Sequence, residues 1–384
     1  MIVAWLQEKL EIAHGRRQTY RSMEGLRGVA ILLVFFCHYF ISAHPWIATR
    51  TIADIGVTGV DLFFVLSGFL IYGAVIQPTS FSVLGYAKNR IRRIYPTFLA
   101  VLFLNLIIWQ VVPGQSRLPS AFSSIVKYLI ANVLLLPAPF IPGGPIIDVA
   151  WSLSYEVFYY CLVPILVFTS GMRRWQSDRR IYFWVGTAII GFCVSYSSHG
   201  VLTRILMFIA GILLFKLYQN KSWCPVHGGG MLFGTVVLLF GVRGFIPVTI
   251  NAAILYVIPF IFLLYFVASS LNPLSLCYKW LSSTPLRWLG NMSYSFYLLH
   301  KLSIEFSFSL LEKFYPPQLS QTNMIFLGFW LPILFFAICS SFVLFLFVER
   351  PFSIVPRGRL PQQYVRLDLT GTRMISEEDN LREK

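Results

Sequence analysis

Charged side chains are scarce in this sequence. Asp, Glu, Lys and Arg together make up 12% of the 384 residues, about half the share found in an ordinary soluble domain. Hydrophobic residues reach 57%, and the mean hydropathy is +0.68. This composition excludes a soluble globular protein, and the long apolar runs indicate an all-α polytopic integral membrane protein.

Acidic residues are scarcer than basic ones, and the formal net charge is +15. In a soluble protein such an excess would suggest a nucleic-acid partner. Here the Lys and Arg residues punctuate apolar runs, and no basic block is interleaved with aromatic residues. We therefore expect no nucleic-acid binding, a lipid bilayer as the surroundings, and basic residues that report topology.

The spacings of metal sites and disulfides are also missing. The six cysteines include no CxxC pair and no His–Cys ligand spacing, and four of them fall in apolar runs. We expect neither a disulfide nor a bound metal. Residues 1–21 lack the apolar core and cleavage site of a signal peptide, and a short interfacial helix is expected there.

Ten apolar segments are long enough to cross a bilayer. They are 26–44, 57–77, 94–112, 152–170, 181–197, 202–217, 231–246, 252–271, 288–309 and 323–348. With a cytoplasmic N-terminus, 24 of the 31 Lys and Arg residues fall on the inner side. The positive-inside rule therefore predicts about ten transmembrane helices with both termini in the cytoplasm.

This topology divides the chain into three parts. We expect a cytoplasmic N-terminal segment at 1–21, a membrane domain at 22–352, and a cytoplasmic C-terminal tail at 353–384 whose end is disordered. The longest connection between spans is the outer loop 113–151. Its apolar stretch 128–137 is too short to span and is followed by prolines, which predicts a re-entrant or interfacial segment over the outer side of the active cavity.

The first span carries two ionisable residues, Arg27 and His38. Eleven helical steps separate them, so they lie about 16 Å apart along one face of the helix. If Arg27 is at the membrane surface, His38 lies near the middle of the bilayer, where an ionisable side chain is a functional candidate. The alternative is a packing histidine whose ring is hydrogen bonded by a neighbouring helix.

Polar residues at the second and third spans have two readings each. Asp61 either orients an imidazole or a substrate hydroxyl, or caps the helix N-terminus; Ser67 lies two turns deeper, where small residues allow close packing. Arg90 and Arg93 share one helix face and are spaced to hold a phosphate. The alternative for this arginine pair is a topological anchor.

The fourth and ninth spans add a carboxylate and a second histidine. Glu156 follows Trp151 by about one turn, and at that depth it needs a partner or a cavity. Its alternative is an acid that is favourable at a helix N-terminus. His300 either lines the cavity or is a packing histidine, and Glu349 is expected to pair with a basic residue at the inner surface.

These segments together resemble the membrane acyltransferase-3 family. The resemblance covers residues 20–352 in the correct order. It rests on Glu24-Gly25-Leu26-Arg27-Gly28 with the Arg-x10-His spacing to His38, the block 59–71, the Arg-x-x-Arg of Arg90 and Arg93, Trp-Ser-Leu-x-x-Glu at 151–156, Gly-x-x-Ser-Tyr-x-x-Tyr followed by His300, and Glu349-Arg350-Pro351.

The resemblance implies an O-acyltransferase of the cell inner (plasma) membrane. Its donor would be cytoplasmic acyl-CoA, with acetyl-CoA favoured, and its acceptor a sugar hydroxyl of a cell-surface glycan or lipid-linked precursor; no permanently bound cofactor is implied. The residues then divide into three sets. The catalytic set is His38, Glu156 and Asp61, the donor-binding set is Arg27, Arg90 and Arg93, and the substrate-binding set is His300, Trp151 and Ser67.

In this reading His38 is the general base that takes the proton of the acceptor hydroxyl. An acyl-enzyme relay is an alternative, although no nucleophilic Ser or Cys stands out by its spacing. A transporter or flippase of a lipid-linked sugar is a second class of function, but inverted repeats and broken helices are not apparent. A non-catalytic membrane sensor is a third.

Overall fold

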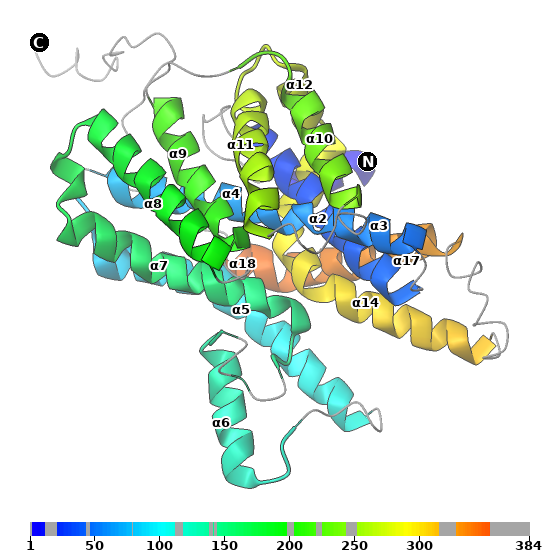
Figure 1. Cartoon of the computed structure of the whole chain (residues 1–384). Coiled ribbons are helices and arrows are strands. Elements are labelled where there is room, and N and C mark those ends of the chain that lie inside the picture. Colours follow the sequence, from blue (N-terminus) through cyan, green and yellow to red (C-terminus); the bar gives the residue numbers. More distant parts are fainter. Residues whose placement is uncertain are drawn as a thin grey trace, which may run out of the picture.

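The fold is all-helical in the part of the chain that the computed structural model describes (Figure 1). No strand occurs among these residues, which confirms the all-α class. The described residues are 2–11, 21–43, 47–78, 80–111, 118–137, 141, 144–197, 203–219, 225–242, 252–314 and 328–353.

Each of the ten predicted spans overlaps a helix in its described residues. The helices are α2 (Arg21–Ala43), α4 (Thr58–Ile76), α5 (Val83–Val111), α7 (Trp151–Thr169), α8 (Ser177–Ser197), α9 (Met207–Gln219), α10 (Gly229–Val242), α11 (Ala252–Ser270), α14 (Ser293–Phe314) and α17 (Trp330–Leu344). Within the described residues, five stretches are long and apolar enough to cross a membrane, with α10 and part of α11 apolar but shorter. The five are Arg21–Ala43, Thr49–Ile76, Val83–Val111, Asp148–Thr169 and Trp330–Ser353. The architecture is therefore that of a polytopic membrane protein, and the number ten stays a prediction.

Shorter elements connect these helices. They are α1 (Ile2–Leu10), α3 (Ile47–Gly56), α6 (Phe122–Val133), α12 (Leu276–Leu281), α13 (Thr284–Asn291), α18 (Arg350–Ser353), the 3₁₀ turns η3 (Asp148–Ala150), η4 (Met172–Arg174) and η5 (Thr203–Leu206), and the π-helical turn η7 (Phe345–Glu349).

Helix α2 lies at the centre of the molecule and packs against α3, α4, α12, α13 and α14 (Figure 1). Its first turns approach α12 and α13 closely, because Gly25 faces the carbonyl of Leu281 at the end of α12 and Gly290 of α13 faces the carbonyl of Glu24. Beside this contact the carboxylate of Glu24 accepts a hydrogen bond from Arg287 Nε at 3.0 Å. Two residues of the first motif therefore have a packing function, while Arg27 points elsewhere.

Helix α4 is held equally closely against α9. A Cβ atom on Gly68 would collide with the carbonyl of Phe208, and one on Gly211 would collide with the carbonyl of Val65. Because both residues are glycines, the two backbones can come into contact, as expected for small residues between membrane helices. This contact fixes the depth and rotation of Ser67, the neighbour of Gly68.

The N-terminal helix α1 lies on the bundle. The Trp5 ring packs edge-on against Phe342 at 6.0 Å between centroids, and Asn291 Nδ2 donates to the Leu10 carbonyl at 2.9 Å. The short helix expected in residues 1–21 is thus confirmed for Ile2–Leu10. The tail predicted at 353–384 lies outside the described residues except for its first residue, Ser353.

The long loop 113–151 contains helix α6, which stands apart from the other helices (Figure 1). Its end is tied back to the following chain, because Asn132 Oδ1 accepts from the Ile146 N–H at 2.7 Å and the Tyr128 hydroxyl donates to the Gly144 carbonyl at 3.0 Å. The predicted apolar stretch is therefore partly helical and is shorter than a membrane span.

The expected ion pair of Glu349 is wrong. Its carboxylate accepts hydrogen bonds from the N–H of Ser295 at 3.0 Å and from the hydroxyl of the same residue at 2.5 Å. Ser295 lies in the first turn of α14, whose free N–H groups need acceptors and favour a negative charge. Glu349 thus caps α14 from the end of η7, and no basic residue in the described chain pairs with it.

Candidate active site

A cavity of about 100 Å³ lies among α2, α4, α5, α7 and α14, which is room for several water molecules. Polar and aromatic groups from all five helices line it. They are Arg27, Ser67, Arg90, Arg93, Ser152, Glu156, Tyr160, Ser293, Tyr294 and Tyr297, together with the apolar residues Val60, Phe63, Phe64, Leu66, Leu70, Ile71, Ile94 and Leu153.

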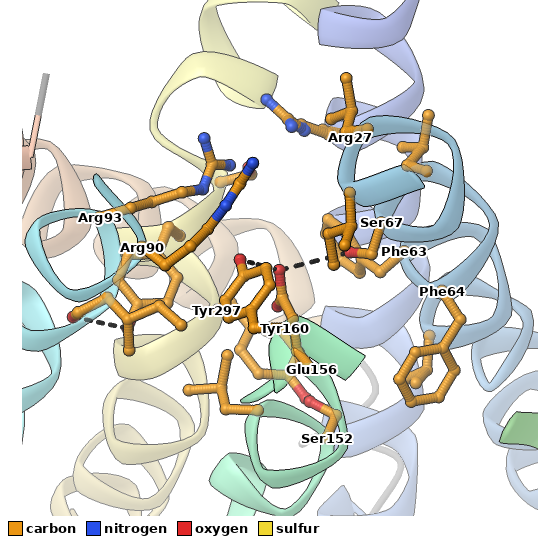
Figure 2. A pocket seen from close by; sticks show the side chains of 18 residues that line it. Arg27, Phe63, Phe64, Ser67, Arg90, Arg93, Ser152, Glu156, Tyr160 and Tyr297 are labelled. Carbon is orange, nitrogen blue, oxygen red and sulfur yellow. Dashed lines mark hydrogen bonds between the residues drawn. The ribbon is translucent and has the colours of Figure 1, made fainter. Parts of the chain in front are cut away.

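Three arginines share this cavity. Figure 2 shows Arg90 and Arg93 of α5 and Arg27 of α2 directing their guanidinium groups towards a common space. None of them forms an ion pair with a carboxylate within the described residues. Only one carboxylate, that of Glu156, lines the same cavity, so the three guanidinium groups give it an excess of positive charge. Such an excess is suited to an anionic ligand, and arginine is the side chain that binds phosphate in a bidentate manner.

The setting of Arg90 is aromatic. Its guanidinium carbon lies 5.0 Å from the ring centres of both Tyr86 and Tyr160, and its buried Nε has no hydrogen-bond partner. Cation–π contacts hold the group in place without using its N–H donors. Arg90 therefore lines the cavity without an ion-pair partner among the described residues, and Arg93, which is exposed, marks the side on which the cavity opens.

Arg90 lies deeper than a surface anchor would. The rings of Phe81 and Phe168 are 4.9 Å apart, and Arg90 lies over Tyr160, so the start of α5 runs antiparallel to the end of α7. Tyr160 precedes Thr169, the last residue of α7, by nine residues, or about 14 Å. Arg90 is thus placed well inside the bundle.

Glu156 supplies the one carboxylate of the cavity. It accepts a hydrogen bond from the Tyr160 hydroxyl at 2.6 Å and one from Ser67 Oγ at 3.4 Å (Figure 2). Glu156 was expected to need a partner or a cavity, and it has hydrogen-bond partners and also lines a cavity. Neither His38 nor His300 is among its contacts, so the geometry does not support a function in orienting a histidine.

The two histidines form a pair of their own. His300 Nε2 lies 3.2 Å from His38 Nδ1, and the rings are 4.9 Å apart between centroids at an angle of 68°. His300 is completely buried, whereas His38 is partly exposed. Neither ring lines the arginine cavity.

Helix α2 runs unbroken through Arg27 and His38, so the distance of about 16 Å along its axis holds. The helix begins at Arg21, six residues before Arg27, and ends at Ala43, five residues after His38. His38 therefore lies nearer the carboxyl end of α2 than its amino end. Its depth in the bilayer stays a prediction.

Tyr297 lies between the cavity and the histidine pair. It lines the cavity, and its ring centre is 5.9 Å from that of His300. Its hydroxyl donates to the Val149 carbonyl at 2.9 Å and lies 2.7 Å from Ser152 Oγ. A single aromatic residue therefore separates the two groups of candidate residues.

Asp61 and Trp151 belong to a third group, around Arg204. The Arg204 Nε lies 3.5 Å from Asp61 Oδ1, its Nη2 donates to the Tyr256 hydroxyl at 3.2 Å, and its guanidinium faces the Trp151 ring at 5.8 Å. Asp61 is fully buried inside α4, whose N-cap is Val57, so it is not the helix cap. This buried ion pair joins α4 to η5.

The structure thus unites Arg27, Arg90 and Arg93 with Ser67 and Glu156, pairs His38 with His300, and places Asp61 and Trp151 elsewhere. No described residue of loop 113–151 lines the cavity, so the expected cover over it is not observed.

Several residues of these groups were not singled out from the sequence. Tyr160 follows Glu156 by four residues, a spacing that places both on one helix face and could have indicated their contact. Lys301 follows His300 directly and forms an ion pair with Asp148. Within the described residues no group of three or more His, Cys, Asp or Glu side chains is placed to hold a metal ion.

Comparison with known proteins identifies the class of protein to which this bundle and cavity belong. The acyltransferase MdmB of Streptomyces mycarofaciens is 26% identical over 86% of this chain and 90% of its own length. The exopolysaccharide production protein ExoZ of Rhizobium meliloti is 26% identical over 65% of this chain and 77% of its own. The peptidoglycan O-acetyltransferase OatA of Listeria monocytogenes is 25% identical over 87% of this chain but only 56% of its own length. No solved structure matches the chain significantly.

The protein is a membrane-embedded acyltransferase. The family model described as an acyltransferase domain matches residues 20–347, and the chain belongs to that family, acyltransferase-3. This confirms the resemblance found in the motifs, and the transporter alternative is not favoured.

Proposed function

We propose that this protein transfers an acetyl group from cytoplasmic acetyl-CoA to a hydroxyl group of a sugar in a cell-surface glycan or its lipid-linked precursor. One observation carries the proposal: three arginines without a carboxylate partner line one cavity inside an acyltransferase bundle. Coenzyme A carries several phosphates, whose negative charge is complementary to these arginines. The names of ExoZ and OatA favour a polysaccharide acceptor and acetyl transfer.

The donor would be held by its phosphates at Arg27, Arg90 and Arg93. Its flexible pantetheine arm would extend along α2, past Tyr297, and present the thioester near His38 about 16 Å away. Arg27 and His38 lie on one face of the same helix, so one ligand can contact both. The acceptor would approach from the opposite end of α2, where the ion pair of Lys301 and Asp148 follows the histidine pair.

His38 is the general base of this proposal. It removes the proton of the sugar hydroxyl while the hydroxyl oxygen attacks the thioester carbonyl. The new C–O bond forms, the C–S bond breaks, and the proton passes from His38 to the leaving thiolate. The products are an O-acetyl sugar and free coenzyme A, and no covalent enzyme intermediate is needed. The setting is the inner (plasma) membrane, with the chain crossing it several times.

The test compares His38→Gln with wild type in lipid nanodiscs, with radiolabelled acetyl-CoA as donor and peptidoglycan or exopolysaccharide fragments as acceptors. Loss of a general base costs about 10²- to 10⁴-fold in rate, so acetyl transfer should fall by that factor while acetyl-CoA binding is kept. His227→Gln is the matched control, because His227 is exposed and does not line the cavity. Turnover near the wild-type rate in His38→Gln would contradict the assignment of the base.

A further inference from the structure

The two histidine rings share a set of hydrogen bonds that fixes the tautomer of each neutral ring. His300 Nδ1 lies 2.8 Å from the carbonyl oxygen of Tyr297 and 3.1 Å from that of Phe296. A carbonyl oxygen only accepts hydrogen bonds, so His300 must carry its proton on Nδ1. In the neutral ring Nε2 is then a bare acceptor.

The same reasoning determines the tautomer of His38. His38 Nδ1 lies 3.2 Å from His300 Nε2 and 3.0 Å from the carbonyl oxygen of Val34. Both neighbours accept, so His38 Nδ1 must be the donor. The opposite tautomer would place its Nδ1 lone pair against two other acceptors. The neutral His38 ring then has its lone pair on Nε2, the nitrogen that makes neither contact.

A doubly protonated His300 would also satisfy the distances, but its burial opposes it. The residue is 0% exposed, and no carboxylate contacts either ring in the part of the chain that the structure describes. The nearest charged side chain along α14, Lys301, is itself paired with Asp148 and Glu305. A charge on His300 would therefore be desolvated without compensation.

We propose that His300 is a positioning residue, which holds His38 in the Nδ1–H tautomer and so leaves Nε2 of His38 as the base. The proposal rests on the proposed function of His38 and deepens it. In many histidine bases a carboxylate or a carbonyl fixes the tautomer and the ring orientation. Here a second, neutral imidazole from α14 does so, and the carbonyls of its own helix set its direction. His300 then acts through His38 and does not touch the substrate.

This arrangement also fits the proton transfer. When His38 accepts a proton on Nε2, the positive charge is shared with Nδ1–H, which donates to His300 Nε2 and to the Val34 carbonyl. The hydrogen bond becomes charge-assisted and stronger, without a second proton having to move. The charge is transient, because the leaving thiolate takes the proton from Nε2.

The direct test is nitrogen NMR of the full-length protein with ¹⁵N-labelled histidine, in lipid at about pH 8, above the ordinary histidine pKa of about 6.5. The chain has only six histidines, so the signals of the pair are assigned by their loss in His38→Gln and His300→Gln. We expect both rings to carry the proton on Nδ1, with a scalar coupling across the hydrogen bond from His38 Nδ1 to His300 Nε2. A His38 ring protonated on Nε2 would overturn the proposal.

Kinetics supply the second readout. In His300→Gln the amide oxygen can reach the position of Nε2 and accept from His38, whereas His300→Phe keeps a ring but no acceptor. We expect His300→Phe to lower kcat by about 10- to 100-fold with an unchanged KM for acetyl-CoA, and His300→Gln to recover part of the loss. Equal rates in the two variants would mean that the residue only packs.

The two proposals fail separately. If His38→Gln keeps its activity, His38 is not the base, but the tautomer measured by NMR still decides whether His300 fixes its protonation. If His38→Gln is inactive and His38 of the wild-type protein carries its proton on Nε2, His38 remains the base and the positioning function of His300 is wrong.

Discussion

One turn of α5 carries three arginines, Arg90, Arg92 and Arg93, whose side chains contact different parts of the protein. Arg92 Nε donates to the Phe352 carbonyl at 2.7 Å and so ties α5 to α18. Arg90 and Arg93 line the cavity, and neither has an ion-pair partner among the described residues. The spacing of three that places Arg90 and Arg93 on one face thus separates two ligand-binding candidates from a structural arginine.

The double variant Arg90→Gln, Arg93→Gln should therefore bind acetyl-CoA weakly. A hydrogen bond to a charged group contributes about 1.5–3 kcal/mol, so loss of two should raise the Kd by about 100-fold or more, measured by equilibrium binding of labelled acetyl-CoA in nanodiscs. A double Lys variant should recover only part of the affinity, because it loses the bidentate geometry.

Arg92→Gln is the matched control for this pair and should bind acetyl-CoA as wild type does. If the double Gln variant inserts normally and binds with unchanged affinity, the Arg-x-x-Arg motif is a topological anchor only.

Side-chain partners within one helix were accessible from the sequence, and those between helices were not. The shared face of Arg90 and Arg93 follows from helical spacing alone. The contact of His38 with His300 depends on which helices become neighbours, and 262 positions separate the two residues. The partner of Asp61 was also not predictable, because Arg204 lies in a 3₁₀ turn that no sequence periodicity indicates.

At the scale of elements, helix ends were the least predictable feature. The ninth span was expected to begin at 288, but the chain forms α13, breaks at Met292 and starts α14 at Ser293. The break leaves free N–H groups at the start of α14, and Glu349 of η7 accepts a hydrogen bond from one of them, that of Ser295. This contact depends on tertiary structure. Hydropathy does not register such a break, because the residues on both sides of it are apolar enough to continue a span.

The close contact of α4 with α9 leads to a prediction about stability. Gly68→Ala would place a methyl group against the Phe208 carbonyl, so the helices must separate. We expect a lower Tm in detergent and reduced acetyl transfer, because Ser67 next to it would move away from Glu156.

Gly186→Ala in α8 is the control, since a Cβ there meets no atom within 4 Å. Alanine favours a helix over glycine by about 0.8–1.0 kcal/mol, so this variant should be as stable as wild type or more so. Equal thermal stability of Gly68→Ala and Gly186→Ala would show that the α4–α9 contact is not tight.

For the whole molecule, the two candidate groups lie towards opposite ends of α2. Arg27 is six residues from the end that the charge distribution assigns to the cytoplasm, and His38 is five residues from the other end. A donor from the cytoplasm and an acceptor from outside would then meet inside the bundle without either crossing it completely. This account depends on the orientation of the helices, which rests on the excess of Lys and Arg on one side.

That orientation is tested by accessibility in intact cells. Single cysteines at Ser177 and Ser222, introduced after replacement of the six native cysteines, should be shielded from an impermeant thiol reagent, because both positions fall in predicted cytoplasmic segments. A cysteine at Ser116 falls in the predicted outer loop and should be labelled. After permeabilisation of the membrane, all three should react, which controls for burial within the protein. Labelling of Ser177→Cys in intact cells would overturn the ten-helix topology, because the end of α7 that lies beside the start of α5, and with it the arginine cavity, would then face outside, away from a cytoplasmic donor.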